Sequence, residues 1–397
     1  ASFATGWSRS TEMARIIGWG HTPFGRLAET LPELVVAAGR EALDHSGVPA
    51  AEIGGIWLGH FNSGMVGDAF ASSLALDIDP DLRFTPATRL ENACASGSAA
   101  LWGALDAVEA GRVDAALVIG VEKMTHLTTP EVTAGLAGAS DQREEAGVSF
   151  PEIFARFARA YAAQYGDRTD ALARIAVKNH ANAMANPLAQ MHKPLDFDFC
   201  RQVSERNPMI ADPLKVTDCS LISDGAAALV VTRDEAARGA ARAVAIRARS
   251  QVSDFLPMSR RSSTELTGAA IAIRQALEAA GLGIADIDVA EVHDCFTIAE
   301  LMVYEAMGLA APGEGHRAIE EGWVARDGIL PVNLSGGLKA KGHPVGATGV
   351  SMHVIAARQV LGEAGDMQRA GAEHALVFNM GGSGVANYAS VLEAAAT

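Results

Sequence analysis

The sequence predicts an α/β protein built from two related halves, with a helical loop domain inserted into the first half. Patterns typical of amphipathic helices alternate with short buried strands along most of the chain, which indicates sheets covered by helices. One helix-and-strand unit occurs twice at a constant offset, which indicates an internal duplication. The third observation is a stretch between the two copies, residues 126–217, that has no counterpart in the second half.

The first repeated unit is a helix that ends at a glycine and is followed by a buried strand. We expect the two strands at residues 56–58 and 289–292. The matching positions are Arg40 with Arg274, Ala42 with Ala276, Leu43 with Leu277, Gly47 with Gly281, and Ile53 with Ile287.

The second repeated unit is an alanine-rich helix followed by a strand that contains Ala-Leu-Val. In the first half the helix is expected at residues 97–110 and the strand at 115–119. In the second half the corresponding segments are 349–361 and 375–378. Residues 223–231 add a further strand to the first half, so each half is expected to hold a sheet and its covering helices.

These patterns divide the chain into three parts. The first half comprises residues 13–125 and 218–249, the loop domain comprises 126–217, and the second half comprises 250–397. Residues 1–12 are polar and small and contain no apolar signal core. We therefore expect them to be an upstream extension outside the fold.

Composition restricts the function. The chain has 397 residues and a formal net charge of −15, and no run of Lys and Arg offsets this charge, which argues against nucleic-acid binding. No apolar run is long enough to span a membrane. The cysteines are few and none has CxxC spacing, so we expect reduced thiols, a cytoplasmic protein and no metal. They are Cys94, Cys200, Cys219 and Cys295.

Cys94 is the first candidate for catalysis. Small residues follow it and lead into the predicted helix at 97–110. The thiol would then lie at a helix N-terminus, where unpaired N–H groups and the helix dipole favour a thiolate. A lone cysteine before an alanine-rich helix is as often a small buried core residue, so this motif alone leaves both interpretations open.

His343 is the second candidate, in a glycine-rich loop that leads into the helix at 349–361. The repeat makes this helix the counterpart of the one behind Cys94. A twofold relation between the halves would therefore bring His343 next to Cys94, which is the minimal arrangement for an activated thiol. The alternative is an anion-binding loop or a plain turn, although the spacing matches neither a P-loop nor a dinucleotide fingerprint.

Two further blocks follow predicted strands. Residues 293–296 (His-Asp-Cys-Phe) come directly after the strand at 289–292, and residues at such a strand end often project into an active site. Acid–base and oxyanion roles fit this block, but a satisfied histidine and a buried cysteine are the commoner outcome. Residues 379–384 (Asn-Met-Gly-Gly-Ser-Gly) follow the last predicted strand and form either a backbone oxyanion hole or a simple turn.

Together these four blocks resemble the signatures of the thiolase family. Cys94 with its Ala-Ser-Gly continuation is similar to the nucleophile block of that family. Gly342-His343-Pro344, within residues 333–349, resembles the second signature and is the most specific match. The resemblance runs from about Met13 to the C-terminus, loop domain included. It implies a thiolase-like, duplicated five-layer αβαβα fold.

The chain departs from the best-known thiolases at two places. Those enzymes carry Asn-Glu-Ala-Phe at the position of residues 293–296, and a second catalytic cysteine at the position of Asn379. Both differences resemble the sterol-carrier-protein-type branch, in which the cysteine of the His-Asp-Cys-Phe block is thought to replace the missing thiol. One thiol is lost where another is gained, so we expect an active enzyme.

The resemblance implies an acyltransferase of fatty acid metabolism that forms or cleaves 3-ketoacyl-CoA through an acyl–Cys94 intermediate. His343 would take the proton of Cys94, and Cys295 would exchange the proton on the α-carbon of a second acyl-CoA. One thioester oxygen would be held by His293, with water and His343, and the other by the backbone N–H groups of Cys94 and Gly381. Acyl-CoA and CoA are then substrates, no cofactor is expected, and a homodimer or homotetramer is implied.

Three other activities stay open from the sequence. Cys94 with His293 and His343 also fits a decarboxylating ketoacyl synthase, although the context of Cys295 argues against it. An acyltransferase with a non-CoA acceptor and a non-catalytic acyl-CoA-binding subunit are the others. Acyl chain length, branching and direction are not determined by the sequence. Residues 150–154 are expected either to line the acyl pocket or to pack in a helix contact.

Overall fold

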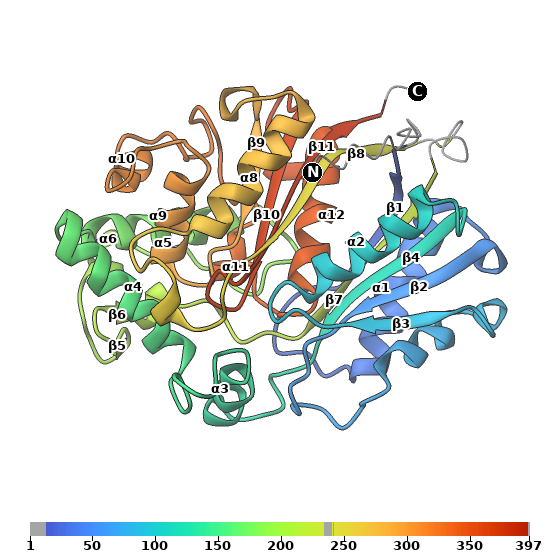
Figure 1. The fold of residues 1–397 in the computed structure, drawn as a ribbon, viewed down its shortest axis with the longest axis horizontal. Coiled ribbons are helices and arrows are strands. Elements are labelled where there is room, and N and C mark those ends of the chain that lie inside the picture. The colour runs from blue at the N-terminus through green and yellow to red at the C-terminus, as the bar shows by residue number, and fades with distance from the viewer. Residues whose placement is uncertain (1–12, 234–239, 241, 396–397) are drawn as a thin grey trace, which may run out of the picture.

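The computed structural model describes residues 13–233, 240 and 242–395 (Figure 1). The predicted extension at residues 1–12 lies outside the described residues. The strands are β1 (Arg15–His21), β2 (Ile53–Gly59), β3 (Ala87–Leu90), β4 (Ala115–Glu122), β5 (Met209–Ala211), β6 (Leu214–Lys215), β7 (Gly225–Thr232), β8 (Val244–Ser253), β9 (Val289–Val292), β10 (His374–Gly381) and β11 (Ala386–Ala394). The helices are α1 (Leu31–Ser46), α2 (Ser96–Glu109), α3 (Thr129–Ala137), α4 (Phe150–Tyr165), α5 (Thr169–Ala183), α6 (Phe197–Arg201), α8 (Thr267–Ala280), α9 (Thr297–Ala306), α10 (Gly315–Glu320), α11 (Gly337–Ala340) and α12 (Thr348–Val360).

The sheet confirms the predicted duplication. Nine strands form one mixed sheet in the order β3-β2-β4-β7-β1-β8-β11-β10-β9. In the first half β2 and β4 are parallel, β7 is antiparallel to β4, and β1 is antiparallel to β7. In the second half β9 and β10 are parallel, β11 is antiparallel to β10, and β8 is antiparallel to β11. Strand order and direction are therefore related by a pseudo-twofold at the antiparallel contact between β1 and β8.

Helices and sheet halves alternate in layers (Figure 1). α1 packs on β1, β4 and β7, whereas α8 packs on β8 and β11. Between the two sheet halves lie α2 and α12, which contact each other as well as strands. The hydrophobic core around α2 and α12 contains residues from both halves, among them Trp102, Val118, Val354 and Val377. This sequence of layers is the five-layer αβαβα arrangement that the family resemblance predicts.

Two glycines confirm the first repeated unit. Gly47 ends α1 with a φ of 70°, and Gly281 ends α8 with a φ of 69°. Both values lie in the left-handed region, which glycine adopts without the steric cost of a Cβ. The two helices therefore stop in the same way before the strands that they precede.

The strands that the sequence analysis did not predict are β1, β3, β5, β6, β8 and β11, and β11 bears most directly on the site. The strand predicted at 375–378 is not the last one, because β11 follows β10 and pairs with both β10 and β8. Asn379 consequently lies inside β10, not after it. The reason is that β11 is buried on both faces over most of its length, so it lacks the alternation of apolar and polar residues that marks a half-exposed strand.

Helices α3 to α6 and the β5–β6 hairpin fill the segment that the sequence assigns to the loop domain. Although this segment leaves the first half, α4 and α5 pack against α9 of the second half. Figure 1 shows these green helices beside the orange α9 and α10. Phe154 of α4 stacks on Phe296, with ring centroids 4.5 Å apart. The boundaries of the three predicted parts stay a prediction. No helix among the described residues is long and apolar enough to cross a membrane.

Candidate active site

A cavity of about 430 Å³ opens where the two halves and the inserted helices meet. Its wall includes Cys94, Cys295 and His343, three of the four residues predicted to be catalytic. Of the segment 150–154, Phe150 lines the cavity whereas Phe154 is buried in the core, so both predicted outcomes occur in one helix.

Cys94 lies in a tight loop directly before α2. Ala93 has a φ of 50°, a left-handed conformation that turns the chain sharply at this point. Ser96 holds the loop because its Oγ donates to Ala93 O at 2.7 Å and accepts the N–H of Asn92 at 2.9 Å. The thiol therefore sits beside the start of a helix, as the sequence predicts.

His343 is fixed at its backbone and at one ring nitrogen. Its N–H donates to Ser223 Oγ at 2.9 Å, and its Nδ1 lies 2.7 Å from Thr348 Oγ1. The Thr348 hydroxyl donates its own proton to Pro344 O at 3.1 Å, so it can only accept from the ring. Nδ1 therefore carries the imidazole proton. Nε2 is buried, bare and without a partner among the described residues.

His293 is held in the same tautomer by Asn379. The amide atom of Asn379 that lies 3.3 Å from the Cys94 carbonyl must be nitrogen, because a carbonyl can only accept a hydrogen bond. The same nitrogen lies 2.9 Å from Ser98 Oγ. Asn379 Oδ1 consequently faces His293 Nδ1 at 2.8 Å and receives its proton. Nε2 of His293 is again bare, buried and without a partner in the described structure.

These groups converge on one point. Cys94 Sγ and one ring nitrogen from each of His293 and His343 all lie within 4.8 Å of one another. The two rings meet edge to face, with centroids 5.2 Å apart. A thiol is thus placed beside two imidazoles whose free nitrogens can each accept a proton. The twofold relation between the halves achieves this, because α2 and α12 begin side by side.

Burial determines the resting protonation of this cluster. Burial raises the pKa of the Cys94 thiol to about 12, while the N–H groups of Gly382 and of Cys94 itself act in the opposite direction. Burial lowers the pKa of His293 to about 4 and that of His343 well below its usual value. The site therefore holds a neutral thiol and two neutral imidazoles at neutral pH.

The side chains of Cys295 and Asp294 lie in different environments, although the residues are adjacent in the sequence. Cys295 is 6% exposed and lines the cavity, and burial first, then nearby Cys94, raises its pKa well above the usual thiol value. Asp294 instead accepts the backbone N–H of Leu338 at 2.6 Å and that of Lys339 at 3.1 Å. Burial and the neighbouring Glu300 raise the pKa of Asp294 to about 7. Asp294 therefore supports α11 and does not line the cavity.

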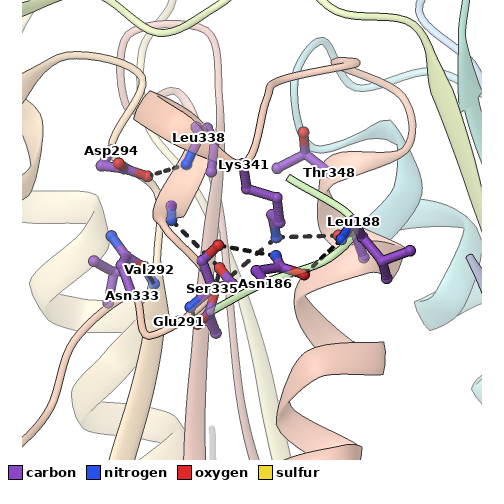
Figure 2. A network of polar contacts seen from close by, with 12 residues as sticks. Asn186, Leu188, Glu291, Val292, Asp294, Asn333, Ser335, Leu338, Lys341 and Thr348 are labelled. Atoms are coloured by element: carbon purple, nitrogen blue, oxygen red, sulfur yellow. Dashed lines mark hydrogen bonds and ion pairs between the residues drawn. The ribbon is translucent and has the colours of Figure 1, made fainter. Parts of the chain in front are cut away.

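A buried polar network positions the loop that carries His343 (Figure 2). Glu291 accepts the Ser335 hydroxyl at 2.5 Å and the Ser335 N–H at 3.1 Å. Asn333 Oδ1 accepts the N–H of Val292 at 2.8 Å. Strand β9, which ends one residue before His293, is thereby tied to the loop that leads to His343. The network therefore joins the two segments from which the histidines follow.

The predicted oxyanion glycine lies at the end of β10. A Cβ added at Gly381 would lie 2.3 Å from Asn92 O, so only glycine lets this strand end approach the Cys94 loop so closely. The glycine that lines the cavity is its neighbour, Gly382. Its N–H, together with that of Cys94 itself, favours the Cys94 thiolate.

Sequence reasoning missed several residues that complete the site. The hydroxyl of Thr348 follows His343 by five positions, and a threonine at a helix start beside a candidate histidine is a signal that could have been used. Ser223 bonds across the two halves to His343, and Asn379, whose role was not predicted, bonds across them to Cys94 O. No local pattern reveals these contacts. Lys339 also lines the cavity. A charged residue in the predicted glycine-rich loop is another signal that could have been used.

The same cluster has the donor types that zinc accepts, namely one thiolate and two imidazole nitrogens. The bare Nε2 atoms would suit a metal as well as a proton. The expectation that no metal takes part therefore stays a prediction, and the test proposed below includes it.

The comparisons with known proteins agree with this geometry. The family model "Thiolase, N-terminal domain" matches residues 14–235, and "Thiolase C-terminal domain-like" matches residues 250–394. An acetyl-CoA acetyltransferase of Methanothermobacter thermautotrophicus is 40% identical over 93% of this chain and 96% of its own. Sterol carrier protein 2 of Oryctolagus cuniculus is 31% identical over 94% of this chain and 70% of its own.

Solved structures show the same fold. The Ltp2–ChsH2(DUF35) aldolase has a TM-score of 0.81 at 23% identity, covering 96% of this chain and 98% of that one. A monomeric SCP2-thiolase-like protein of Mycobacterium smegmatis has a TM-score of 0.75 at 18% identity, covering 97% of this chain and 78% of that one. Fold, site geometry and sequence agree, and the chain belongs to the thiolase family.

Proposed function

We propose that this protein is an acyl-CoA acyltransferase that forms or cleaves 3-ketoacyl-CoA through an acyl–Cys94 intermediate. The observation that carries the proposal is the convergence of Cys94 with one ring nitrogen from each of His293 and His343, two imidazoles whose Nε2 atoms have no partner among the described residues. The relative from Methanothermobacter thermautotrophicus is an acetyl-CoA acetyltransferase, which agrees with this activity.

In the first step His343 removes the proton of Cys94 as the thiol attacks a thioester or ketone carbonyl. A thiol with a pKa of about 12 is rarely a thiolate at neutral pH, so proton transfer to a positioned base has to accompany the attack. Thr348 keeps Nε2 of His343 free for this proton. The imidazolium that results can then donate to the developing oxyanion.

In the second step of condensation Cys295 removes a proton from the α-carbon of acetyl-CoA. The carbanion then attacks the acyl–Cys94 carbonyl, so that the carbon–carbon bond forms as the thioester bond to Cys94 breaks, and cleavage is the reverse of this step. The resting form of Cys295 is the thiol, which suits protonation of the carbanion released by cleavage. For condensation the same group must first lose its proton, and His293 is the neighbouring base that can accept it. Because Asn379 leaves Nε2 of His293 bare, that histidine becomes a hydrogen-bond donor only after it has gained a proton.

Backbone N–H groups stabilise the second oxyanion. We assign this role to the N–H groups of Cys94 and of the Gly381–Gly382 turn, which lie at a helix start and at a strand end. Donors fixed in a buried site are effective because they need no reorganisation when charge develops. CoA and acyl-CoA are substrates in this scheme.

Mass spectrometry tests the proposal directly. Incubation with acetyl-CoA is expected to acetylate the peptide that contains Cys94, and Cys94→Ala is expected to remove both the adduct and turnover. An adduct on Cys200 or Cys219 would overturn the assignment. Thiolysis of acetoacetyl-CoA is expected to survive a chelator, whereas loss of activity and its recovery with Zn²⁺ would indicate a metal at this cluster.

A second candidate is a decarboxylating ketoacyl synthase, favoured by the two histidines beside Cys94. Such an enzyme would condense malonyl-CoA faster than acetyl-CoA, whereas a thiolase uses acetyl-CoA. An assay of both substrates in the condensation direction separates them. Turnover with neither, together with tight acyl-CoA binding, would indicate a non-catalytic subunit.

The assembly, location and division of the chain belong to the same proposal. We propose a homodimer or homotetramer in the cytoplasm, with a loop domain at residues 126–217 between the first half (13–125 and 218–249) and the second half (250–397). The inserted helices and the strand order support this division. Sedimentation at micromolar concentration tests the assembly, and a monomer would contradict it.

A further inference from the structure

Lys339 is a buried lysine that has no part in the reaction proposed above. It belongs to α11, four positions before His343, and its exposed fraction is 3%. It lines the same cavity as Cys94 and Cys295. Its ammonium group therefore adds a formal charge to the wall of the active site.

Every other buried lysine of the described chain is paired with a carboxylate. The Nζ–oxygen distances are 2.7 Å for Lys123–Asp224, 2.6 Å for Lys178–Glu300, 2.7 Å for Lys215–Asp218 and 3.9 Å for Lys341–Glu291. Lys339 differs, because no carboxylate of the described residues lies within 4.0 Å of its Nζ and no hydrogen bond reaches it. Asp294 accepts only the backbone N–H of Lys339.

An ammonium without a counter-charge in a largely buried site costs free energy, because it has lost much of its water and gained no anionic partner. Burial accordingly lowers the pKa of Lys339. His180, which lines the same cavity, has a pKa lowered to about 4 by burial and stays neutral. The neutral His180 ring therefore does not offset the charge of the Lys339 ammonium, and it does not attract the same anion. A bound anion would supply the partner that the chain itself does not provide.

The charges around the cavity suit an anion. On a chain with a net charge of −15, the charged residues among the described cavity lining are Lys193, Arg206 and Lys339, and no carboxylate is among them. Lys193 and Arg206 are exposed, so water solvates them and they suit the phosphates of CoA. Lys339 is buried, which suits a small anion that is carried into the cavity.

We propose that Lys339 binds a carboxylate on the acyl group, so that the enzyme prefers 3-ketoacyl-CoA substrates that carry an anionic chain end. This inference rests on the thiolase function proposed above. A CoA phosphate is the other source of an anion, and the experiment separates the two.

The test compares two substrates of equal carbon number in thiolysis. One is 3-oxohexanoyl-CoA, which ends in a methyl group, and the other is 3-oxoadipyl-CoA, which ends in a carboxylate. The parent enzyme is expected to prefer 3-oxoadipyl-CoA in kcat/KM. Lys339→Met is expected to reduce the ratio of the two kcat/KM values by about 10- to 100-fold, because a hydrogen-bonded charge pair has been removed.

Lys193→Met serves as the matched control, because it removes an exposed charge from the same cavity. It is expected to change both kcat/KM values alike, through CoA. Replacing CoA by 3′-dephospho-CoA tests whether Lys339 binds the 3′-phosphate of CoA. If 3′-dephospho-CoA lowers kcat/KM of the parent but does not lower kcat/KM of Lys339→Met, Lys339 binds the CoA phosphate and the inference is wrong. An unchanged substrate ratio in Lys339→Met also overturns it.

A stability measurement keeps the inference testable if the kinetics of the variant are weak. Removing an unpaired buried charge is expected to raise the melting temperature of Lys339→Met above that of the parent. A marked fall would show that Lys339 has a structural partner, which contradicts the proposal. Failure of the parent to cleave acetoacetyl-CoA would instead reject the thiolase function, and the two failures are therefore distinguishable.

Discussion

Asn379 determines which nitrogen of His293 carries a proton, and so what that histidine can do. Its nitrogen donates toward Cys94 O and Ser98 Oγ, which leaves its oxygen for His293 Nδ1. A thiolase that carries a cysteine at this position cannot make these contacts. The residue that replaces the second catalytic thiol here therefore acts through His293.

Asn379→Asp tests this positioning role. A carboxylate next to Nδ1 favours the imidazolium and raises the pKa of His293 from its value of about 4. As the pH falls, Nε2 of His293 then becomes protonated, and stops accepting protons, at a higher pH than in the parent. We expect the acidic limb of the pH profile of kcat/KM to move upward, by about one pH unit or more. Steady-state rates between pH 4.5 and 9 measure this shift.

Asn379→Leu is the control for Asn379→Asp. It removes the hydrogen bond to His293 without adding a charge. Because that hydrogen bond raises the pKa of His293, Asn379→Leu is expected to lower the rate and to move the acidic limb downward, opposite to Asn379→Asp. Equal pH profiles in the parent and in Asn379→Asp would show that Asn379 only packs the site.

Cys295→Ala is expected to separate the two steps of the reaction. Cys295 lines the cavity and is placed to exchange the proton of the second substrate. Acetylation of Cys94 should survive in the variant, whereas thiolysis and condensation should fall by about 10²- to 10⁴-fold, the usual contribution of an acid–base group. Mass spectrometry of the adduct and steady-state rates measure the two effects.

Cys219→Ala is the matched control, because Cys219 lines the same cavity and has no assigned role. It should retain most of the turnover. If Cys295→Ala condenses or cleaves at the parent rate, Cys295 is a packing residue and His293 is the next candidate for the base.

At the scale of elements, the contact between α2 and α12 joins the two halves of the site. A Cβ added at Gly349 would lie 2.5 Å from Ser98 N and 2.6 Å from Asn379 Nδ2. Helix propensity alone would make Gly349→Ala stabilising by about 1 kcal/mol. The backbone contact is too short for a methyl group, so α12 has to move away from α2.

We therefore expect Gly349→Ala to destabilise the protein by about 1–3 kcal/mol, the usual cost of overpacking. Turnover should fall further than stability, because His343 moves away from Cys94. Gly67→Ala is the control, since no atom lies within 4 Å of its added Cβ. Urea unfolding and steady-state rates measure the two effects. A Gly349→Ala protein with full activity would show that the helices can separate without consequence.

The elements that the sequence predicted are those whose pattern is local. Strand β9 was predicted with its exact bounds, and the two repeated helices within one residue at each end, because apolar periodicity and glycine caps mark them. The meeting of Cys94 and His343 followed from the repeat. Strand β11 escaped prediction because it is buried on both faces and carries no alternation.

The features of the site that could not be predicted from the sequence depend on tertiary contacts. The tautomer of His293 depends on an amide that belongs to β10 and bonds to the Cys94 loop. The unpaired state of Lys339 depends on where every carboxylate of the fold lies. Neither property has a signature in the neighbouring residues, although the presence of a histidine and a lysine in those loops was visible.

At the scale of the whole molecule, the number of buried neutral histidines is large enough to shape stability. Burial lowers the pKa of His21 to about 3 and that of His180, His293 and His353 to about 4. In the unfolded chain these groups titrate near 6.5. Between pH 6.5 and 4 the unfolded chain therefore binds more protons than the folded one, which favours unfolding as the pH falls.

Asp294 acts in the opposite direction over part of that range. Its pKa is raised to about 7, so the folded protein binds its proton more tightly than the unfolded chain does, and stability rises as the pH falls from 7 toward 4. One carboxyl group offsets about one histidine. The net effect of these five groups is a loss of stability on acidification, with three histidines left unopposed.

We therefore expect the free energy of unfolding to fall between pH 6.5 and pH 4, by an amount on the order of 1–3 kcal/mol for each unopposed histidine. Urea unfolding at half-unit steps of pH measures the slope. His353 provides the sharpest check, since it lies in α12 and bonds to Ser390 at 2.9 Å, outside the catalytic cluster. His353→Gln keeps a hydrogen-bonding side chain that cannot gain a proton, so the slope should become shallower by about one histidine. A slope identical to that of the parent would show that His353 titrates in the folded protein as it does in the unfolded chain.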